Sequence, residues 1–346
     1  MHCLYMKKIS FLPVLFCIAA CTSSNKQVSA PDNRITYTNP VFNHDFPDPN
    51  VVDGHDGYWY AYSTEADWSA DGISGGRRII PILKSKDLAA WEIVGPALAK
   101  KPDWKPAGGI WAPDVTEVNG KYLMYYSFST WGDPNPGIGF AVADKAAGPF
   151  TDKGKLFFSQ ELGVDNSIDP FLWAEDGKLL LYWGSFHGIY AVELTADGSK
   201  IVGEKFQVAG SAYEGSTIVK HNSYYYYFGS VGTCCEGERS TYRVLVGRAT
   251  APRGPFIDQS GKPLLDNGGT ELLRRNEGNT GFVGTGHNAD LVTDKAGQTW
   301  MLYHAYDNKP GAKGRKMLLD KISWVNDWPV IANTSPTLTP QAIPKF

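Results

Sequence analysis

A short pattern recurs five times along this chain of 346 residues. In each copy a polar turn opens a strand rich in Tyr, Trp and Leu, which is the signal of a β-hairpin. The copies cover residues 56–63, 119–127, 176–185, 222–230 and 297–304. Repeats about 46 to 75 residues apart are typical of the four-stranded blades of a β-propeller. The sequence therefore predicts an all-β fold, a five-bladed β-propeller with its functional site at the central channel.

The N-terminal residues predict export. Lys7 and Lys8 precede an apolar run, residues 9–20, that is too short to span a bilayer but fits a signal peptide. Cys21 follows this run as in a bacterial lipobox, and an ordinary secretory signal is the alternative. We predict a lipoprotein signal peptide over 1–20, a polar tether over 21–34 and the propeller domain over 35–346. A lipid on Cys21 would hold the exported protein at a membrane, periplasmic or at the cell surface; otherwise it is secreted.

The charge balance excludes polyanionic partners. With 33 Lys and Arg against 36 Asp and Glu, the net charge is −3, which gives no long-range attraction for nucleic acid or an acidic membrane surface. We expect no nucleic-acid partner, membrane contact only through the lipid, and a monomer.

Only two cysteines, Cys234 and Cys235, lie outside the leader and the residue that follows it. Neighbouring Cα atoms are about 3.8 Å apart, below the usual range of about 4.4–6.8 Å for a disulfide. Two packed thiols are therefore the favoured interpretation, and a strained ring between neighbours is the alternative.

The residues just before each repeat are candidates for the functional site. In a propeller, the first residues of the innermost strand open onto the channel. Counting back about eight to ten residues from each turn gives Asp48, Ala112, Asp169, Glu214 and His287. Three carboxylates are thus expected to converge on one cleft. Asp114 lies in a different register and is expected to be structural.

Converging carboxylates, without a Cys and His metal cluster or a phosphate loop, indicate acid and base chemistry on a neutral substrate. Glycosidic hydrolysis needs such a pair, one group protonating the leaving oxygen and the other activating water. Asp48 and Glu214 belong to non-adjacent blades, so the channel mouth should separate them, which predicts inversion. Asp169 is expected to raise the pKa of the acid by like-charge repulsion.

Three motifs in this sequence resemble glycoside hydrolase family 43, five-bladed propeller enzymes that act on arabinans and xylans. The motifs are Asp48-Pro49, Trp111-Ala112-Pro113 and Ile168-Asp169-Pro170. The resemblance implies that Asp48 is the general base, that Asp169 tunes and orients the acid, and that Glu214 is the general acid. Residues 234–248, 284–288 and 303–307 resemble the endo-1,5-α-L-arabinanases of that family, although Pro47 stands where a histidine is common among them.

Several further side chains are candidates for substrate contacts. Sugar faces are apolar, so the rings of Trp111, Phe171 and Phe186 are expected to stack on them, with core packing between blades as the alternative. Asn166 and Ser167 are expected to bond sugar hydroxyls, unless they merely end a strand.

The resemblance also implies an ion near the channel floor. His287 would hold calcium or another ion there, directly or through water, and no organic cofactor is expected. From the residue alone, His287 is equally a hydrogen-bonded loop residue.

Three hypotheses for function follow. The first is an endo-acting arabinanase that cleaves arabinan or arabino-oligosaccharides. The second is an exo-acting α-L-arabinofuranosidase or β-xylosidase on the same fold. The third is a non-catalytic carbohydrate-binding propeller, which is disfavoured because grouped buried carboxylates are costly without a purpose. The first is favoured because the chain ends at Phe346, without the added C-terminal β-domain that many exo-acting relatives carry.

Overall fold

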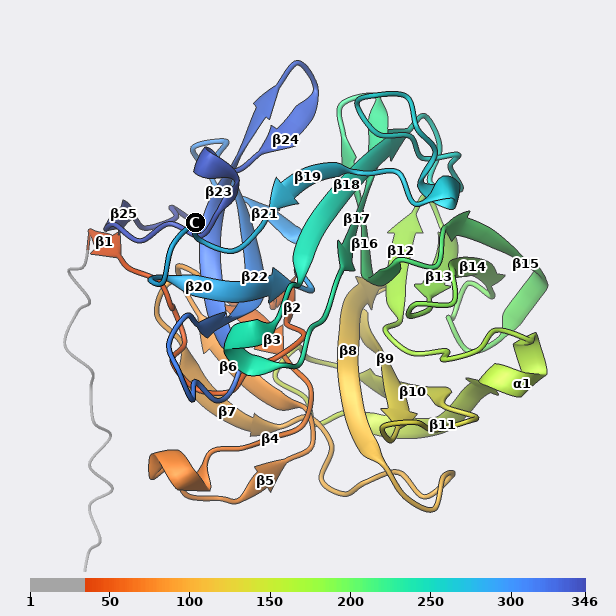
Figure 1. Ribbon diagram of the computed structural model, residues 1–346. Coiled ribbons are helices and arrows are strands. Elements are labelled where there is room, and N and C mark those ends of the chain that lie inside the picture. The colour runs from red at the N-terminus through yellow and green to blue at the C-terminus, as the bar shows by residue number, and fades with distance from the viewer. Residues whose placement is uncertain (1–34) are drawn as a thin grey trace, which may run out of the picture. The chain divides into compact units, whose positions relative to one another are not determined.

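The computed structural model describes residues 35–346. The signal peptide and tether predicted for residues 1–34 lie outside the described residues. Within the described part, five antiparallel sheets follow one another in chain order around a central channel (Figure 1). The predicted five-bladed β-propeller is confirmed.

Each blade has its first strand in the chain at the channel and its last strand outside. Blade one contains β2 (Asn50–Asp53), β3 (Trp59–Tyr62), β6 (Pro81–Ser85) and β7 (Glu92–Pro96). Blade two contains β8 (Gly109–Val118), β9 (Lys121–Ser129), β10 (Gly137–Ala143) and β11 (Thr151–Phe158). Blade three contains β12 (Phe171–Glu175), β13 (Lys178–Trp183), β14 (Ile189–Leu194) and β15 (Ile201–Ala209).

The last two blades continue the same order. Blade four contains β16 (Tyr213–His221), β17 (Tyr224–Val231), β18 (Arg243–Ala249) and β19 (Thr270–Leu273). Blade five contains β20 (Phe282–Gly286), β21 (Leu291–Thr293), β22 (Thr299–Asp307), β23 (Lys316–Val325) and β24 (Trp328–Val330). Both β20 and β21 pair with β22, so the inner strand of this blade is interrupted.

Small elements complete the described chain. They are β1 (Thr36–Tyr37), β4 (Ala66–Asp67), β5 (Arg77–Arg78), β25 (Gln341–Ala342), the helix α1 (Ser159–Leu162) and the 3₁₀ turns η1 (Ser69–Asp71), η2 (Gly237–Arg239), η3 (Leu264–Asp266) and η4 (Ala332–Thr334). No helix among residues 35–346 is long and apolar enough to cross a membrane.

The repeated aromatic segments form the second strand of every blade, namely β3, β9, β13, β17 and β22. The turn before β9 explains why the pattern folds locally as a hairpin. Asn119 and Gly120 have φ values of 52° and 76°, the two positive values that a tight type I′ turn requires. Asn and Gly tolerate this conformation better than other residues.

The hydrophobic core consists of five clusters, one between each pair of neighbouring blades. Between blades one and two, Tyr62 of β3 is fully buried and its ring packs edge-on against Phe150, with centroids 5.9 Å apart. Its hydroxyl donates to the carbonyl of Ala146 at 2.5 Å. Because each sheet packs on two neighbours, both faces of the second strand are buried, which accounts for its aromatic composition.

The two ends of the described chain meet and close the ring. β1 pairs antiparallel with β25, and Phe42 bridges Met317 of blade five. The hydroxyl of Tyr37 donates to the carbonyl of Leu319 at 2.8 Å. The segment before blade one is therefore bonded to blade five.

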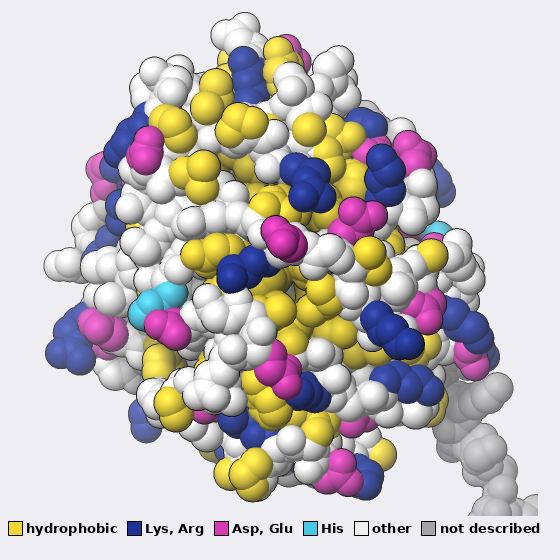
Figure 2. All heavy atoms as spheres, turned by 90° about the vertical axis from the view of Figure 1, so that its right-hand side faces the viewer, with side chains coloured by type: hydrophobic (Ala, Val, Ile, Leu, Met, Phe, Trp, Pro, Cys, Tyr) yellow, Lys and Arg dark blue, Asp and Glu magenta, His cyan; other side chains and the backbone are white. Residues whose placement is uncertain are grey.

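Figure 2 shows the side of the molecule that is on the right in Figure 1. Lysine and arginine side chains alternate with acidic ones on this face, and no large patch of one sign gathers there. Charged side chains of both signs are therefore mixed over this face.

Candidate active site

Each blade has a residue of left-handed backbone within its inner strand or just before it, and most of the predicted site residues occupy this position. The φ values are 54° for Asp48, 43° for Ala112, 58° for Asp169 and 47° for His287. In blade four the left-handed residue is Gly215, at 59°, and Glu214 comes one residue earlier. The predicted equivalence of five positions thus holds in four blades, and Glu214 reaches the channel from the neighbouring position. Gly215 can take the left-handed place in blade four because glycine adopts that conformation without strain.

In four blades, the backbone N–H of the residue with positive φ donates a hydrogen bond to a side chain of the preceding blade. Ala112 donates to Thr64 Oγ1 at 2.8 Å, and Asp169 donates to Ser127 Oγ at 2.9 Å. His287 donates to Ser230 Oγ at 2.8 Å, and Asp48 donates to His304 Nδ1 at 3.1 Å. These acceptors lie on the second strands or just after them. They connect neighbouring blades around the channel and fix the backbone that carries the site.

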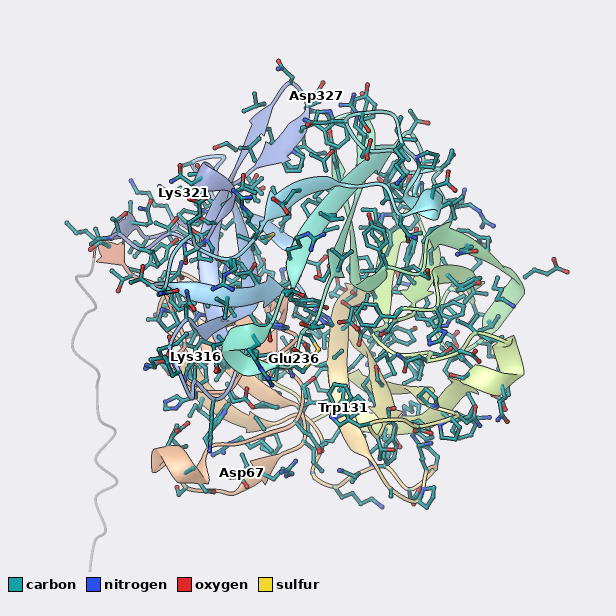
Figure 3. All side chains as sticks on the ribbon, viewed as in Figure 1. Asp67, Trp131, Glu236, Lys316, Lys321 and Asp327 are labelled. Carbon is teal, nitrogen blue, oxygen red and sulfur yellow. A yellow bond between two sulfur atoms is a disulfide. The ribbon has the colours of Figure 1, made fainter. Side chains whose placement is uncertain are left out.

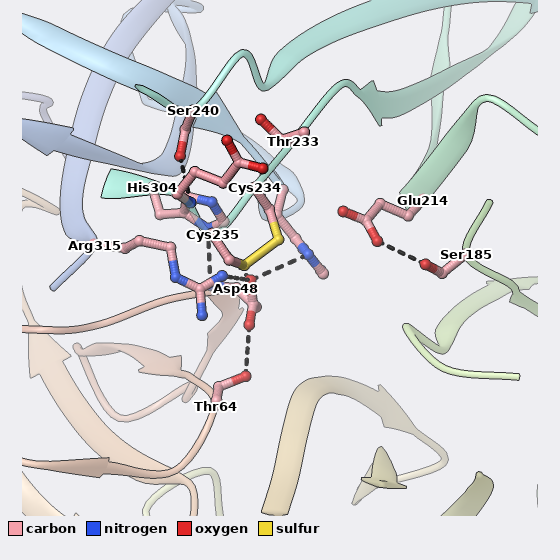
Figure 4. Close-up of a disulfide and its surroundings, with 12 residues drawn as sticks. Asp48, Thr64, Ser185, Glu214, Thr233, Cys234, Cys235, Ser240, His304 and Arg315 are labelled. Carbon is pink, nitrogen blue, oxygen red and sulfur yellow. Dashed lines mark hydrogen bonds and ion pairs between the residues drawn. A yellow bond between two sulfur atoms is a disulfide. The ribbon is translucent and has the colours of Figure 1, made fainter. Parts of the chain in front are cut away.

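Blade three supplies the exception to this arrangement. Ser185, just after β13, directs its hydroxyl at the side chain of Glu214 and donates to Oε2 at 2.7 Å (Figure 4). The N–H of Gly215 is hydrogen-bonded to the Asp169 carboxylate instead. Two carboxyl groups of the candidate site therefore take part in the contact between blades three and four.

Asp48 is held as a carboxylate. Arg315 Nη1 donates to its Oδ1 at 2.8 Å and Thr64 Oγ1 donates to its Oδ2 at 2.6 Å (Figure 4). The Nδ1 atoms of His287 and His304 lie 3.4 Å from Oδ1. Burial alone would raise the pKa of Asp48, but its neighbours, first among them the positively charged Arg315, outweigh this effect, and the pKa falls well below its usual range.

His304 is neutral in this arrangement. Its Nδ1 accepts the N–H of Asp48, so the ring proton is on Nε2. Burial, followed by the charge of Arg315, lowers the pKa of His304 well below its usual value. The ring lies parallel to that of Tyr242, with centroids 5.7 Å apart.

Glu214 has the opposite character to Asp48. Burial raises its pKa to about 7, and the negative charge of Asp48 adds to the rise, while the Ser185 hydrogen bond and Arg315 oppose it. Glu214 therefore keeps its proton at mildly acidic pH, where Asp48 has lost its own.

Asp169 lies in the same buried group. Burial raises its pKa well above the usual value, and the charges of Glu214 and Asp48 raise it further. Because Asp169 and Glu214 are buried together, ionisation of one carboxyl group makes ionisation of the other less favourable. For Glu214 itself, burial is the larger cause of the raised pKa.

These groups line one cavity of about 660 Å³ at the mouth of the channel. Asp48, Asp169, Glu214, His287 and Arg315 supply its polar wall. Rings of Trp111, Trp131 and Phe186 supply much of its apolar wall. Apolar rings beside a few fixed polar groups suit a neutral ligand with hydroxyl groups and apolar faces.

The predicted substrate contacts divide into two groups. Trp111, Asn166 and Phe186 line the cavity. Ser167 is buried beside it, where its hydroxyl bonds Val164 and Trp183. Phe171 packs between blades three and four, with its ring centroid 6.2 Å from that of Tyr182. Neither Ser167 nor Phe171 lines the cavity, because their side chains are used in packing and in holding the loop.

The site also contains residues that the sequence did not single out. Arg315 comes from the segment before β23, and nothing in the repeat marks it. Thr64, Ser185 and His304 did carry a signal, because a polar residue ends or follows the aromatic strand in every copy of the repeat.

Cys234 and Cys235 form a disulfide, so the interpretation as packed thiols is wrong. The usual Cα separation describes cysteines far apart in the chain, whereas here the bond closes a small ring through one peptide. The pair lies in the loop after β17 and lines the cavity that holds Asp48 and Glu214 (Figure 4).

The ion predicted near His287 is not confirmed by the described residues. Calcium takes about 6–8 oxygen ligands. Among residues 35–346, no three His, Cys, Asp or Glu side chains come together in a way that could hold a metal ion. His287 lies beside Asp48. Asp114 accepts hydrogen bonds from the Asn50 side chain and from the backbone N–H of Leu172, which suits the structural role expected of it.

The sequence matches the model of one protein family and is similar to proteins of related activity. Residues 37–329 match the model of the family described as glycosyl hydrolases family 43. An extracellular endo-α-(1→5)-L-arabinanase of Bacillus subtilis is 34% identical over 286 residues, which cover 78% of this chain and 83% of that protein. An extracellular exo-α-(1→5)-L-arabinofuranosidase of Cellvibrio japonicus is 29% identical over 305 residues, covering 79% of this chain and 82% of that protein.

A solved structure extends the similarity to the fold. The α-L-arabinanase of Cellvibrio cellulosa in complex with arabinohexaose has a TM-score of 0.73 and 28% identity, covering 84% of this chain and 96% of that one.

Proposed function

This chain belongs to glycosyl hydrolase family 43 and is a glycoside hydrolase, and we propose that it cleaves internal α-1,5-arabinofuranosidic bonds of arabinan with inversion. In this proposal Asp48 is the general base, Glu214 is the general acid and Asp169 tunes and orients the acid. The observation that carries it is the opposite state of two carboxyl groups in one cavity. Asp48 is ionised beside Arg315, whereas burial raises the pKa of Glu214 to about 7, so that Glu214 keeps its proton at mildly acidic pH.

The reaction follows from these states. The Asp48 carboxylate takes a proton from a water molecule, whose oxygen attacks the anomeric carbon. As the glycosidic bond breaks, Glu214 gives its proton to the leaving oxygen, so a neutral hydroxyl departs. Exchange with solvent then removes the proton from Asp48 and returns one to Glu214. A single displacement inverts the anomeric configuration, and the base and acid coming from blades one and four supports this outcome.

Neighbouring groups hold the two carboxyls in place. Arg315 and Thr64 each bond one oxygen of Asp48, which leaves the carboxylate in one fixed orientation. Ser185 does the same for Glu214. Fixed orientation matters because acid and base must act on opposite sides of one sugar carbon.

The substrate assignment is supported by the relatives, which include an endo-arabinanase, an exo-arabinofuranosidase and an arabinanase bound to arabinohexaose. The exo-acting relative makes exo cleavage as an α-L-arabinofuranosidase the second candidate. A β-xylosidase on the same fold is the other exo-acting alternative. A non-catalytic sugar-binding protein accounts poorly for a buried acid beside an ionised base.

Linear arabinan distinguishes these candidates. We expect the early products to be a mixture of arabino-oligosaccharides, measured by chromatography within the first few per cent of hydrolysis. Release of arabinose alone, or of a single short oligosaccharide, from the outset would contradict endo cleavage. Absence of any product would contradict the assignment of arabinan as the substrate.

Export is part of the proposal, because two relatives are described as extracellular. The lipid on Cys21 and the monomeric state remain predictions. The ion near His287 also remains a prediction, and none of the steps above passes through it.

A further inference from the structure

Tyr242, the residue before β18, is a buried side chain beside the acid that takes part in none of the steps above. It is 1% exposed, and its ring lies parallel to that of His304. Its hydroxyl interacts with the carboxyl group of Glu214 but falls short of a normal hydrogen bond, and it has no other partner among residues 35–346. Burying a hydroxyl without a hydrogen bond is unfavourable, so this one calls for an explanation.

The Tyr242 ring is held in one place by its surroundings. Gly286 leaves the space that the ring occupies, since a Cβ atom on Gly286 would lie 2.2 Å and 2.4 Å from two of the ring carbons. The backbone N–H of Tyr242 donates to the carbonyl of Thr233 at 3.1 Å, which closes the loop that carries the disulfide. Glu236 in this loop lies toward the centre of the propeller face and not at its rim (Figure 3). The packed ring keeps the hydroxyl beside Glu214.

We propose that Tyr242 is a positioning residue for the acid, and that its hydroxyl completes a hydrogen bond to Glu214 as Glu214 becomes a carboxylate. The inference rests on the proposed function, because it takes Glu214 to be the group that protonates the leaving oxygen. It adds a donor that acts on the acid and not on the sugar.

The change of charge on Glu214 explains why the bond forms only during the reaction. Before proton transfer Glu214 is neutral, and Ser185 already donates to its Oε2. As the glycosidic bond breaks, the proton of Glu214 passes to the leaving oxygen, and the carboxyl group becomes a stronger acceptor. Hydrogen bonds at active sites are often poorly aligned in the free enzyme and tighten as the reaction proceeds. A contact that is stronger in the transition state than in the resting enzyme lowers the barrier.

Tyr242 remains a donor throughout the reaction. Burial raises the pKa of its hydroxyl well above the usual value, and the charges of Glu214 and Asp169 raise it further. Tyr242 therefore keeps its own proton and only shares it with the carboxylate. The charged and titratable groups around this hydroxyl are Glu214, Asp169, Asp48, Arg315 and His304.

Tyr242→Phe removes the hydroxyl and keeps the ring. At about pH 6 we expect kcat on arabino-oligosaccharides to fall about three- to tenfold, with KM within about twofold of the parent value. The alkaline limb of the pH–rate profile should move up by about one pH unit, because the ionised form of Glu214 loses a donor. On an arabinotrioside with a dinitrophenol leaving group, which needs no acid, the rate should change by less than about twofold.

Stability separates this role from a structural one. Tyr125→Phe is the matched control, since Tyr125 is also fully buried, its hydroxyl donates to the carbonyl of Gly198 at 2.7 Å, and it does not line the cavity. We expect Tyr125→Phe to lower the midpoint of urea denaturation and to leave kcat unchanged. Tyr242→Phe should lower kcat and leave the urea midpoint equal or higher, because it removes a buried hydroxyl that had no full hydrogen bond.

Three results would overturn the proposal. They are an alkaline limb that does not move in Tyr242→Phe, an equal loss of rate on the two substrates, and a urea midpoint below that of the parent protein. The proposed function is tested separately, with the parent protein and Glu214→Gln. A parent protein that does not cleave arabinan, or a Glu214→Gln protein that loses equally on both substrates, would contradict the role of Glu214 whatever Tyr242→Phe does.

Discussion

At single residues, the proposed chemistry depends on two carboxyl groups whose surroundings differ. Asp48 has a guanidinium and a hydroxyl on its oxygens, whereas Glu214 has one hydroxyl and is otherwise buried. The sequence predicted both residues, because motifs next to a repeated strand marked them. It could not predict Arg315, which reaches Asp48 from the far end of the chain through closure of the ring. It also could not place Ser167 and Phe171, since neighbours of Asp169 along a strand point in different directions.

The pKa values predict the pH dependence of kcat/KM. Glu214 must carry its proton, and it loses that proton as the pH rises through about 7, so the rate should fall about tenfold per pH unit above that value. Asp48 must be ionised, and its lowered pKa means that no loss is expected on the acid side down to about pH 5. A pH–rate profile on arabino-oligosaccharides measures both. A profile that rises from pH 6 to 9 would contradict the assignment of Glu214.

Ser185 is expected to be a positioning residue for the acid. Its hydrogen bond stabilises the ionised form of Glu214, so Ser185→Ala should move the alkaline limb to higher pH and lower kcat at the optimum. Ser85→Ala is the matched control, because Ser85 is also buried and its hydroxyl bonds Asp87, outside the cavity. A lower rate with an unmoved limb would mean that Ser185 has only a structural role.

At the scale of elements, local and non-local features differed in how well they could be predicted. The turns and aromatic strands were predicted because their signals lie within ten residues. The register of Glu214 was one position off, because Gly215 takes the left-handed place that Asp48, Asp169 and His287 take elsewhere. The bond between Cys234 and Cys235 was not favoured, since spacing statistics describe cysteines that are distant in sequence.

The hydrogen bonds between blades should contribute to stability. Ser230→Ala removes the acceptor of the His287 N–H group and leaves that partly buried donor unpaired, which should cost about 1 kcal/mol of unfolding free energy. Urea denaturation measures the change. Ser223→Ala, in the exposed turn before β17, is the control and should stay within about 0.5 kcal/mol. Equal urea midpoints for Ser230→Ala and Ser223→Ala would show that the hydrogen bond between Ser230 and His287 does not contribute to stability.

At the scale of the whole molecule, five similar blades give a ring whose channel mouth gathers side chains from separate parts of the sequence. The cavity takes Asp48 from blade one, Asp169 from blade three and Glu214 from blade four. The five-fold repeat made the fold predictable, because each copy carries the same local pattern. The shape of the cavity depends on loops that differ from blade to blade, and no repeat predicts it.

The central claim is that Glu214 donates a proton and Asp48 accepts one. Its most direct test compares Glu214→Gln and Asp48→Asn on arabino-oligosaccharides and on an arabinotrioside with a dinitrophenol leaving group. Glu214→Gln should lose about 10²–10⁴-fold on the natural substrate and far less on the activated one, which needs no acid. Asp48→Asn should lose activity on both. Equal losses of Glu214→Gln on the two substrates, or a fully active Asp48→Asn, would contradict the account.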